Sequence, residues 1–112
     1  MTSPAPGRPV RGSATGRPIM AALDLLGRRW ALRVLWELRD GPVGARALIE
    51  RCDNVSSSVL YGRLRELRGA GLVEQDVDDA YVLTAIGRRL GVAIEPLSEW
   101  ATEWAVDRAD RS

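Results

Sequence analysis

Apolar residues recur every three or four positions in the segment that begins at residue 18, which is the period of a helix with one buried face. Pro18 suits the first turn of such a helix, and Gly27 suits its end. The apolar positions of this segment are Ile19, Leu23, Leu26 and Trp30. The pattern therefore predicts a first helix that starts near Pro18.

Two more helices are predicted before residue 52. The first ends at residues 40–42, where Asp-Gly-Pro is a strong turn signal, and its apolar positions are Leu32, Leu35 and Leu38. The second is a short helix over residues 45–51, and its apolar positions are Ala45, Leu48 and Ile49. Both helices can therefore bury one face in a common core.

A longer helix is predicted over residues 56–70. Ser56 starts it, because a serine side chain can accept a hydrogen bond from an exposed backbone N–H of the first turn. Its apolar face consists of Leu60, Leu64 and Leu67. The opposite face consists of Ser58, Tyr61, Gly62, Arg65 and Gly69, flanked by Ser57 and Arg68.

The rest of the chain predicts a hairpin and a final helix. Residues 72–75 and 80–83 have the composition of short strands, with an acidic turn at 76–79 between them. Thr84 suits the N-cap of the final helix, which covers about 84–107. Pro96 lacks a backbone N–H and is expected to kink this helix.

This order of elements predicts a mainly α fold with a small β-hairpin, the winged helix-turn-helix. In such a fold the second helix of the helix-turn-helix pair enters the major groove of DNA and presents its N-terminal residues to base edges. In this chain that recognition helix is residues 56–70. A chain of 112 residues is long enough for one such domain and too short for two.

Residues 1–16 are rich in Pro, Gly, Ser and Thr and have little to bury, so they are predicted to form a disordered arm ahead of a domain at 17–112. This arm has no apolar stretch that could form the core of a signal peptide. No run in the chain approaches the roughly 18 apolar residues of a membrane span. We therefore expect a soluble, cytoplasmic protein with no membrane partner.

The charges are unevenly distributed along the chain, and every basic residue is arginine. Residues 17–72 carry ten arginines against six acidic residues, whereas residues 73–112 carry four against nine. Guanidinium groups suit phosphate because they form two parallel hydrogen bonds with it. The pattern is that of a surface facing a polyanion, and ordinary solvated faces produce the same pattern.

Few catalytic or metal-binding groups are present. The chain has no histidine and a single cysteine, Cys52, which excludes an internal disulfide, a cysteine-based zinc site and most acid-base catalytic sites. No glycine-rich phosphate loop follows a predicted strand. We therefore predict no enzymatic activity, no metal and no cofactor, and we expect Cys52 to be a small buried hydrophobe.

Short motifs in a fixed order carry a family resemblance. They are the segments 22–27, 29–30, 37–38, 40–42, 63–67, 71–74, 83–84, 87–88 and 99–100, together with Ser56. In this order and spacing, residues 18–104 resemble the HxlR family of bacterial winged-helix regulators. The resemblance implies a homodimer whose terminal helices pair and whose two recognition helices read an inverted repeat in double-stranded DNA.

The chain departs from the family pattern at three places. Many family members have a redox-active cysteine just before the first helix, where this chain has Arg17 and Pro18. The wing tip at 76–79 is shorter and more acidic than is usual, and Ser57 and Ser58 replace a common Pro-Lys pair. The first departure excludes thiol sensing at that position, the second leaves open whether the wing contacts DNA, and the third removes an expected phosphate or base contact.

Seven residues of the recognition helix are candidate DNA contacts, namely Ser56, Ser57, Ser58, Tyr61, Arg63, Arg65 and Arg68. We favour Arg65 and Arg68, because arginine is the commonest reader of base edges. Arg63 lies nearer the buried edge, so a structural role and a phosphate contact are both open. Tyr61 is either a DNA contact or a partly buried aromatic.

The candidate dimer interface consists of Ile19, Leu23, Leu97, Trp100 and Trp104. The two tryptophans are four residues apart on one helix face, and aromatic anchors favour interfaces. The monomer core and a ligand site are the second and third alternatives. A small-molecule effector is left open.

Two functions are weighed. The first is a sequence-specific DNA-binding regulator that acts as a homodimer on an inverted repeat, and the arginines of residues 56–70 support it. The alternative is a winged-helix protein-interaction module that has lost DNA binding, and the acidic wing supports it.

Overall fold

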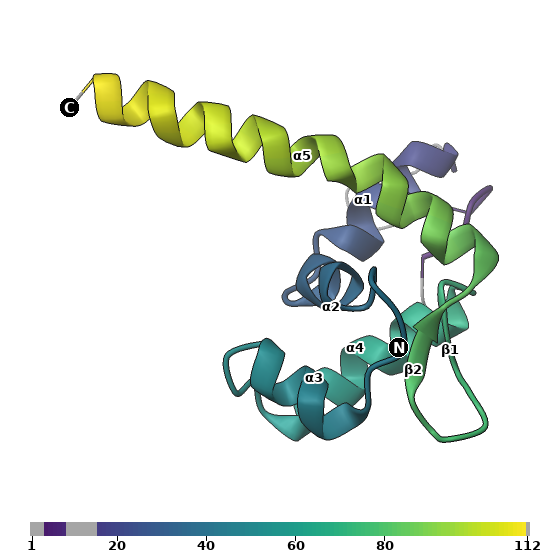
Figure 1. Cartoon of the computed structure of the whole chain (residues 1–112). Helices are drawn as coiled ribbons and strands as arrows, with labels where there is room; N and C mark the ends of the chain where they lie inside the picture. Colours follow the sequence, from purple (N-terminus) through teal and green to yellow (C-terminus); the bar gives the residue numbers. More distant parts are fainter. Residues whose placement is uncertain (1–3, 9–15, 112) are drawn as a thin grey trace.

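The computed structural model describes residues 4–8 and 16–111. Its elements in chain order are α1 (Pro18–Leu26), α2 (Ala31–Glu37), α3 (Ala45–Arg51), α4 (Ser57–Gly69), β1 (Val73–Gln75), β2 (Tyr81–Leu83) and α5 (Ala85–Asp110). Figure 1 shows α2, α3, α4 and the hairpin grouped together, while the C-terminal part of α5 extends away from them. The mainly α fold with a β-hairpin is thus confirmed.

The predicted arm lies largely outside the described residues, which omit 1–3 and 9–15. In its described part, the Gly7 N–H donates a hydrogen bond to the Gly16 carbonyl at 2.9 Å. Pro4 and Pro6 lie beside α1.

The core forms where the apolar faces of the helices meet. The predicted apolar face of α4 is confirmed, since Leu60, Leu64 and Leu67 are at most 1% exposed. The other helices add the buried residues Leu25, Val34, Leu35, Leu38 and Leu48, and the hairpin adds Val73, Tyr81 and Leu83. Burying a leucine side chain contributes about 1.5–3 kcal/mol, so this cluster stabilises the domain and fixes α4 at its surface.

The turn between α1 and α2 differs from the expected pattern. Gly27 caps α1 as predicted, so Trp30 lies outside that helix and its placement on the face of Leu26 was wrong. Trp30 instead precedes α2 with a left-handed backbone, φ 72°. A bulky residue rarely adopts this conformation, and here its side chain packs against the core.

The hairpin is confirmed, with each strand one residue shorter than expected. β1 and β2 pair antiparallel with Val73 opposite Leu83 and Gln75 opposite Tyr81. Val43 extends the pairing, because its N–H donates to the Tyr81 carbonyl at 3.0 Å and its carbonyl accepts from the Tyr81 N–H at 2.9 Å. The chain between α2 and α3 therefore braces the wing against the helices.

Thr84 joins the end of α4 to the start of α5. Its hydroxyl accepts a hydrogen bond from the Gly87 N–H at 3.1 Å, which confirms the predicted cap, and donates one to the Gly71 carbonyl at 2.6 Å. A side chain at Gly87 would bring its Cβ to 2.1 Å from the Leu72 carbonyl oxygen, so the first turn of α5 sits directly on the backbone before β1. We call this contact the Thr84 joint.

α5 continues as one helix from Ala85–Asp110, with Pro96 inside it. Neither α5 nor any other helix in the described ranges is long and apolar enough to cross a membrane.

Candidate nucleic-acid interface

The N-terminus of α4 is exposed and capped by a serine. The Ser56 hydroxyl accepts a hydrogen bond from the Val59 N–H at 3.3 Å, as predicted. Ser56, Ser57 and Ser58 are all exposed. Free backbone N–H groups and the positive end of the helix dipole favour an anion at this end, so a DNA phosphate is a suitable ligand.

The outer face of α4 presents Tyr61 and Arg65 to solvent. Tyr61 is 44% exposed, and Arg65 is exposed one turn further along the helix. Within residues 4–8 and 16–111, Arg65 has no hydrogen bond or ion pair. Its guanidinium group is therefore available to a base or phosphate acceptor.

Arg68 is exposed but bonded to the wing. Its Nη1 donates to the Gln75 Oε1 at 3.1 Å, and the Gln75 amide donates in turn to the Asp79 carbonyl at 3.2 Å. Arg68 therefore connects the end of α4 to the hairpin, while its exposed side chain keeps donors for a phosphate.

Arg63 faces the protein rather than solvent. Its Nη1 donates to both carboxylate oxygens of Glu66, at 3.0 and 2.8 Å. Arg28 pairs with the same carboxylate, 3.1 Å from Nη1 to Oε2, and also pairs with Asp24 at 3.5 Å. The geometry favours the structural alternative for Arg63, because its charge is already compensated. We call these four residues the Glu66 cluster.

Arg46 was missed by the sequence analysis. It is exposed on α3 and lines a hollow of 490 Å³ together with Asn54, Ser57 and Tyr61. In the part of the chain that the structure describes, it has no ion pair. Helical spacing could have found it, since Arg46 is two residues from the buried Leu48 and therefore about 200° round α3 from it.

A second hollow of 540 Å³ lies between α4 and β2. It is lined by Tyr61, Arg65, Arg68 and Tyr81, among others. Tyr61 is common to both hollows, so Arg46, Arg65 and Arg68 belong to one continuous surface. We call this surface, with the serines of α4, the recognition surface.

The wing carries fewer free carboxylates than its sequence implies. The Asp76 Oδ1 accepts hydrogen bonds from the Asp78 N–H at 2.9 Å and the Ala80 N–H at 3.0 Å, so this carboxylate holds the turn together. Asp78 and Asp79 are exposed, and Val77 at the tip is 98% exposed.

The predicted interface residues are all more than half exposed in the single chain. Ile19 and Leu23 lie on α1, and the other three lie along α5. The Trp100 and Trp104 rings stack on each other, with their centroids 5.4 Å apart and their planes at 18°. The monomer core, one of the three alternatives, therefore does not contain these tryptophans.

Cys52, the residue that ends α3, is fully buried in the core, as predicted. Burial raises the pKa of its thiol above the usual value, because the thiolate would lose its hydration. Across residues 4–8 and 16–111, no three His, Cys, Asp or Glu side chains are grouped so as to hold a metal ion.

This domain is a winged helix-turn-helix, since α4 faces solvent as the recognition helix, packs with the preceding helices and is followed by a β-hairpin. Residues 25–109 match the HxlR-like helix-turn-helix family, and the chain belongs to this family. It is a DNA-binding transcriptional regulator, as the resemblance implied.

Similar proteins carry corresponding names. An uncharacterized HTH-type transcriptional regulator of Bacillus subtilis, YvaP, is 34% identical over 89 residues, which are 74% of this chain and 82% of that protein. The HTH-type transcriptional regulator YodB of the same organism is 30% identical over 90 residues, which are 75% of this chain and 80% of that protein.

Solved structures share the fold. The crystal structure of quinone-bound YodB superposes with a TM-score of 0.69 at 32% identity, over 76% of this chain and 94% of that chain. A transcriptional regulator from Enterococcus faecalis, described as of the MarR family, superposes with a TM-score of 0.71 at 30% identity, over 82% of this chain and 89% of that chain.

Proposed function

We propose that this regulator binds an inverted-repeat operator as a homodimer, in the cytoplasm, with α4 of each protomer in the major groove. The recognition surface carries this proposal, since three arginines without a carboxylate partner lie there with an exposed, serine-capped helix start. A two-fold dimer presents two such helices, which suit half-sites one helical turn apart.

The recognition surface divides into one base reader and two phosphate contacts. Arg65 faces outward from the middle of α4 with its fork of donors unused, which suits the O6 and N7 atoms of guanine. Arg46 flanks α4 from α3, and Arg68 is oriented along the wing by Gln75, so both suit the phosphates beside the groove.

The dimer is supported by the apolar surface on α1 and α5. Ile19, Leu23, Leu97 and the stacked tryptophans are exposed in one chain. Exposed apolar side chains grouped on two helices are typical of protein interfaces, and a second copy of the chain would cover them. An effector of small-molecule class fits the same scheme, since the relative YodB has been crystallised with a quinone.

The experiment is a salt-titrated binding assay on duplexes selected from a random library. Arg65→Ala should cost about 1–3 kcal/mol per half-site and relax preference at one base pair. Arg46→Ala should weaken all sequences alike and lower the salt slope by about one unit per half-site. Arg111→Ala is the matched control, because this arginine pairs with Asp107 at the far end of α5.

Two results would contradict the proposal. The base-reading role fails if Arg65→Ala binds the selected operator as the wild type does. If the wild type binds no duplex in a salt-dependent manner, the protein-interaction module takes the place of the DNA-binding function.

A further inference from the structure

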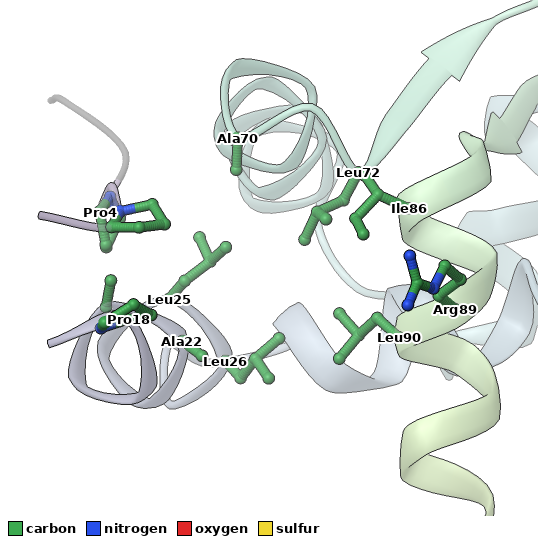
Figure 2. Close-up of a pocket in the computed structure, with 12 residues that line it drawn as sticks. Pro4, Pro18, Ala22, Leu25, Leu26, Ala70, Leu72, Ile86, Arg89 and Leu90 are labelled. Carbon is green, nitrogen blue, oxygen red and sulfur yellow. The ribbon is translucent and has the colours of Figure 1, made fainter.

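A cavity of 590 Å³ lies where α1, the end of α4 and the first turns of α5 meet. Its size is within the range of roughly 300–1,000 Å³ that is typical of small-molecule sites. Figure 2 shows side chains from these elements facing a common space, among them Ala22, Leu25 and Leu26 of α1, Leu72, and Ile86 and Leu90 of α5. We call this cavity the α1–α5 pocket.

The walls of the pocket are apolar apart from one cationic side chain, Arg89. The lining contains no carboxylate, and among residues 4–8 and 16–111 Arg89 has no ion pair or hydrogen bond. Its neighbour Arg88 differs, because it donates to the Leu83 carbonyl at 3.1 Å and does not line the pocket. An apolar cavity with one uncompensated guanidinium group is complementary to an apolar molecule with one negative charge.

We infer that the α1–α5 pocket binds a small apolar monocarboxylate, with its hydrocarbon part between α1 and α5 and its carboxylate on Arg89. The apolar lining provides the hydrophobic contacts, and the guanidinium group provides two parallel donors that match the two carboxylate oxygens. Neutral molecules of the same shape leave that charge uncompensated and bind less tightly.

The pocket is distinct from the proposed dimer surface. Pro18 and Ala22 line the pocket, whereas Ile19 and Leu23 are each one residue later and so lie about 100° further round α1. Pairing of two protomers through Ile19 and Leu23 therefore leaves the pocket side of α1 facing its own protomer.

A ligand in this pocket touches the parts that the proposed function needs in fixed relative positions. Ala70 caps the C-terminus of α4, and the carbonyl of Leu72 accepts a hydrogen bond from the Thr84 N–H at the Thr84 joint. A molecule wedged between these residues and α5 changes the angle between the recognition helix and the dimer helix. This regulatory role rests on the proposed function, whereas ligand binding does not.

The test is equilibrium dialysis of the full chain with 2-naphthoate and with its neutral analogue 2-naphthamide. We expect one naphthoate per protomer and about 10-fold weaker binding of the amide, the loss of one charge-assisted contact. Arg89→Gln should bind naphthoate about 10-fold more weakly and no longer discriminate between the two. The matched control Arg88→Gln should behave as the wild type.

A second variant, Ala22→Leu, fills the pocket with apolar volume and should weaken both ligands, with circular dichroism to verify its fold. Equal binding of naphthoate by the wild type and Arg89→Gln, or a Kd above about 1 mM, overturns the ligand site. Dialysis needs no DNA, so this failure is distinguishable from failure of the proposed function. Bound naphthoate that leaves the affinity for the selected operator unchanged overturns the regulatory role.

Discussion

At the scale of single residues, the arginines around α4 differ in what compensates their charge. Arg63 and Arg28 share the carboxylate of Glu66, and both side chains are largely covered. Arg65 has no such partner in the described ranges and faces solvent. Two arginines that are two positions apart in the sequence therefore have different environments, and only Arg65 is left available for the proposed contact with DNA.

Glu66 is the residue on which the inner charges depend, and its removal should destabilise the fold. In Glu66→Gln, Arg63 loses its counter-charge and Arg28 retains the longer, 3.5 Å pair with Asp24, so we expect a loss of about 3 kcal/mol in the free energy of unfolding. Urea unfolding measures this as a lower midpoint at unchanged slope. Glu74→Gln, at an exposed position of β1, is the control; equal midpoints for both variants would contradict the role of the cluster.

The buried thiol of Cys52 predicts a loss of stability in alkali. Its pKa is raised by burial, so above pH 9.0, the ordinary value, the unfolded chain releases the proton while the folded chain retains it. Ionisation then favours the unfolded chain, and stability falls as pH rises, by at most about 1.4 kcal/mol per pH unit. Urea unfolding between pH 8 and 10 should show a steeper decline for the wild type than for Cys52→Ala.

Tyr81 has a raised pKa for the same reason, above an ordinary value of 10.0. It therefore contributes a further decline at higher pH, which Tyr81→Phe should remove. For Cys52, the contradicting outcome is a free energy of unfolding that falls equally with pH in the wild type and in Cys52→Ala, which would show that the thiol is accessible to water in the folded chain.

At the scale of elements, the helices with local signals were predictable and the contacts between them were not. α3 has the predicted bounds, and α4 differs by one residue at each end, because the Ser56 cap and the leucine period are encoded within the helix itself. Arg28 and Glu66 are 38 positions apart, so no local pattern contains their pairing, and the helical period of the first segment did not predict the left-handed backbone of Trp30. Sequence reasoning therefore found the recognition helix and favoured Arg65 over Arg63 as a DNA contact, but it could not decide between a structural role and a phosphate contact for Arg63.

The wing should reduce DNA affinity without reading sequence. Changing both Asp78 and Asp79 to Asn removes two exposed charges, and asparagine tolerates the left-handed backbone of Asp79, φ 62°. We expect nonspecific affinity to rise about two- to fivefold at low salt, with the ranking of operator variants unchanged. Asp76 is left intact because it holds the turn. A changed ranking would mean that the wing contacts bases.

At the scale of the whole molecule, the exposed tryptophans predict the assembly. Trp100 and Trp104 are 53% and 55% exposed in one chain, so Trp100→Ala with Trp104→Ala should release folded monomers, seen by light scattering with circular dichroism as the check of folding. Val77→Ala, at the 98% exposed wing tip, is the control and should leave the assembly unchanged. A wild-type protein that stays monomeric at high concentration would contradict the homodimer.

The Thr84 joint fixes the N-terminal end of α5, so a small change of angle there displaces the C-terminal end of the helix. The helix has 26 residues, so at 1.5 Å per residue it is about 39 Å long, and it is seated at one end on the Leu72 carbonyl where Gly87 leaves no space. If α5 tilts by about 5° about this contact, its C-terminal end moves by about 3.4 Å, which equals the rise of one base pair. In the proposed dimer, the close contact that Gly87 allows by lacking a Cβ therefore helps to set the distance between the two recognition helices, and with it the spacing of the half-sites that the dimer fits.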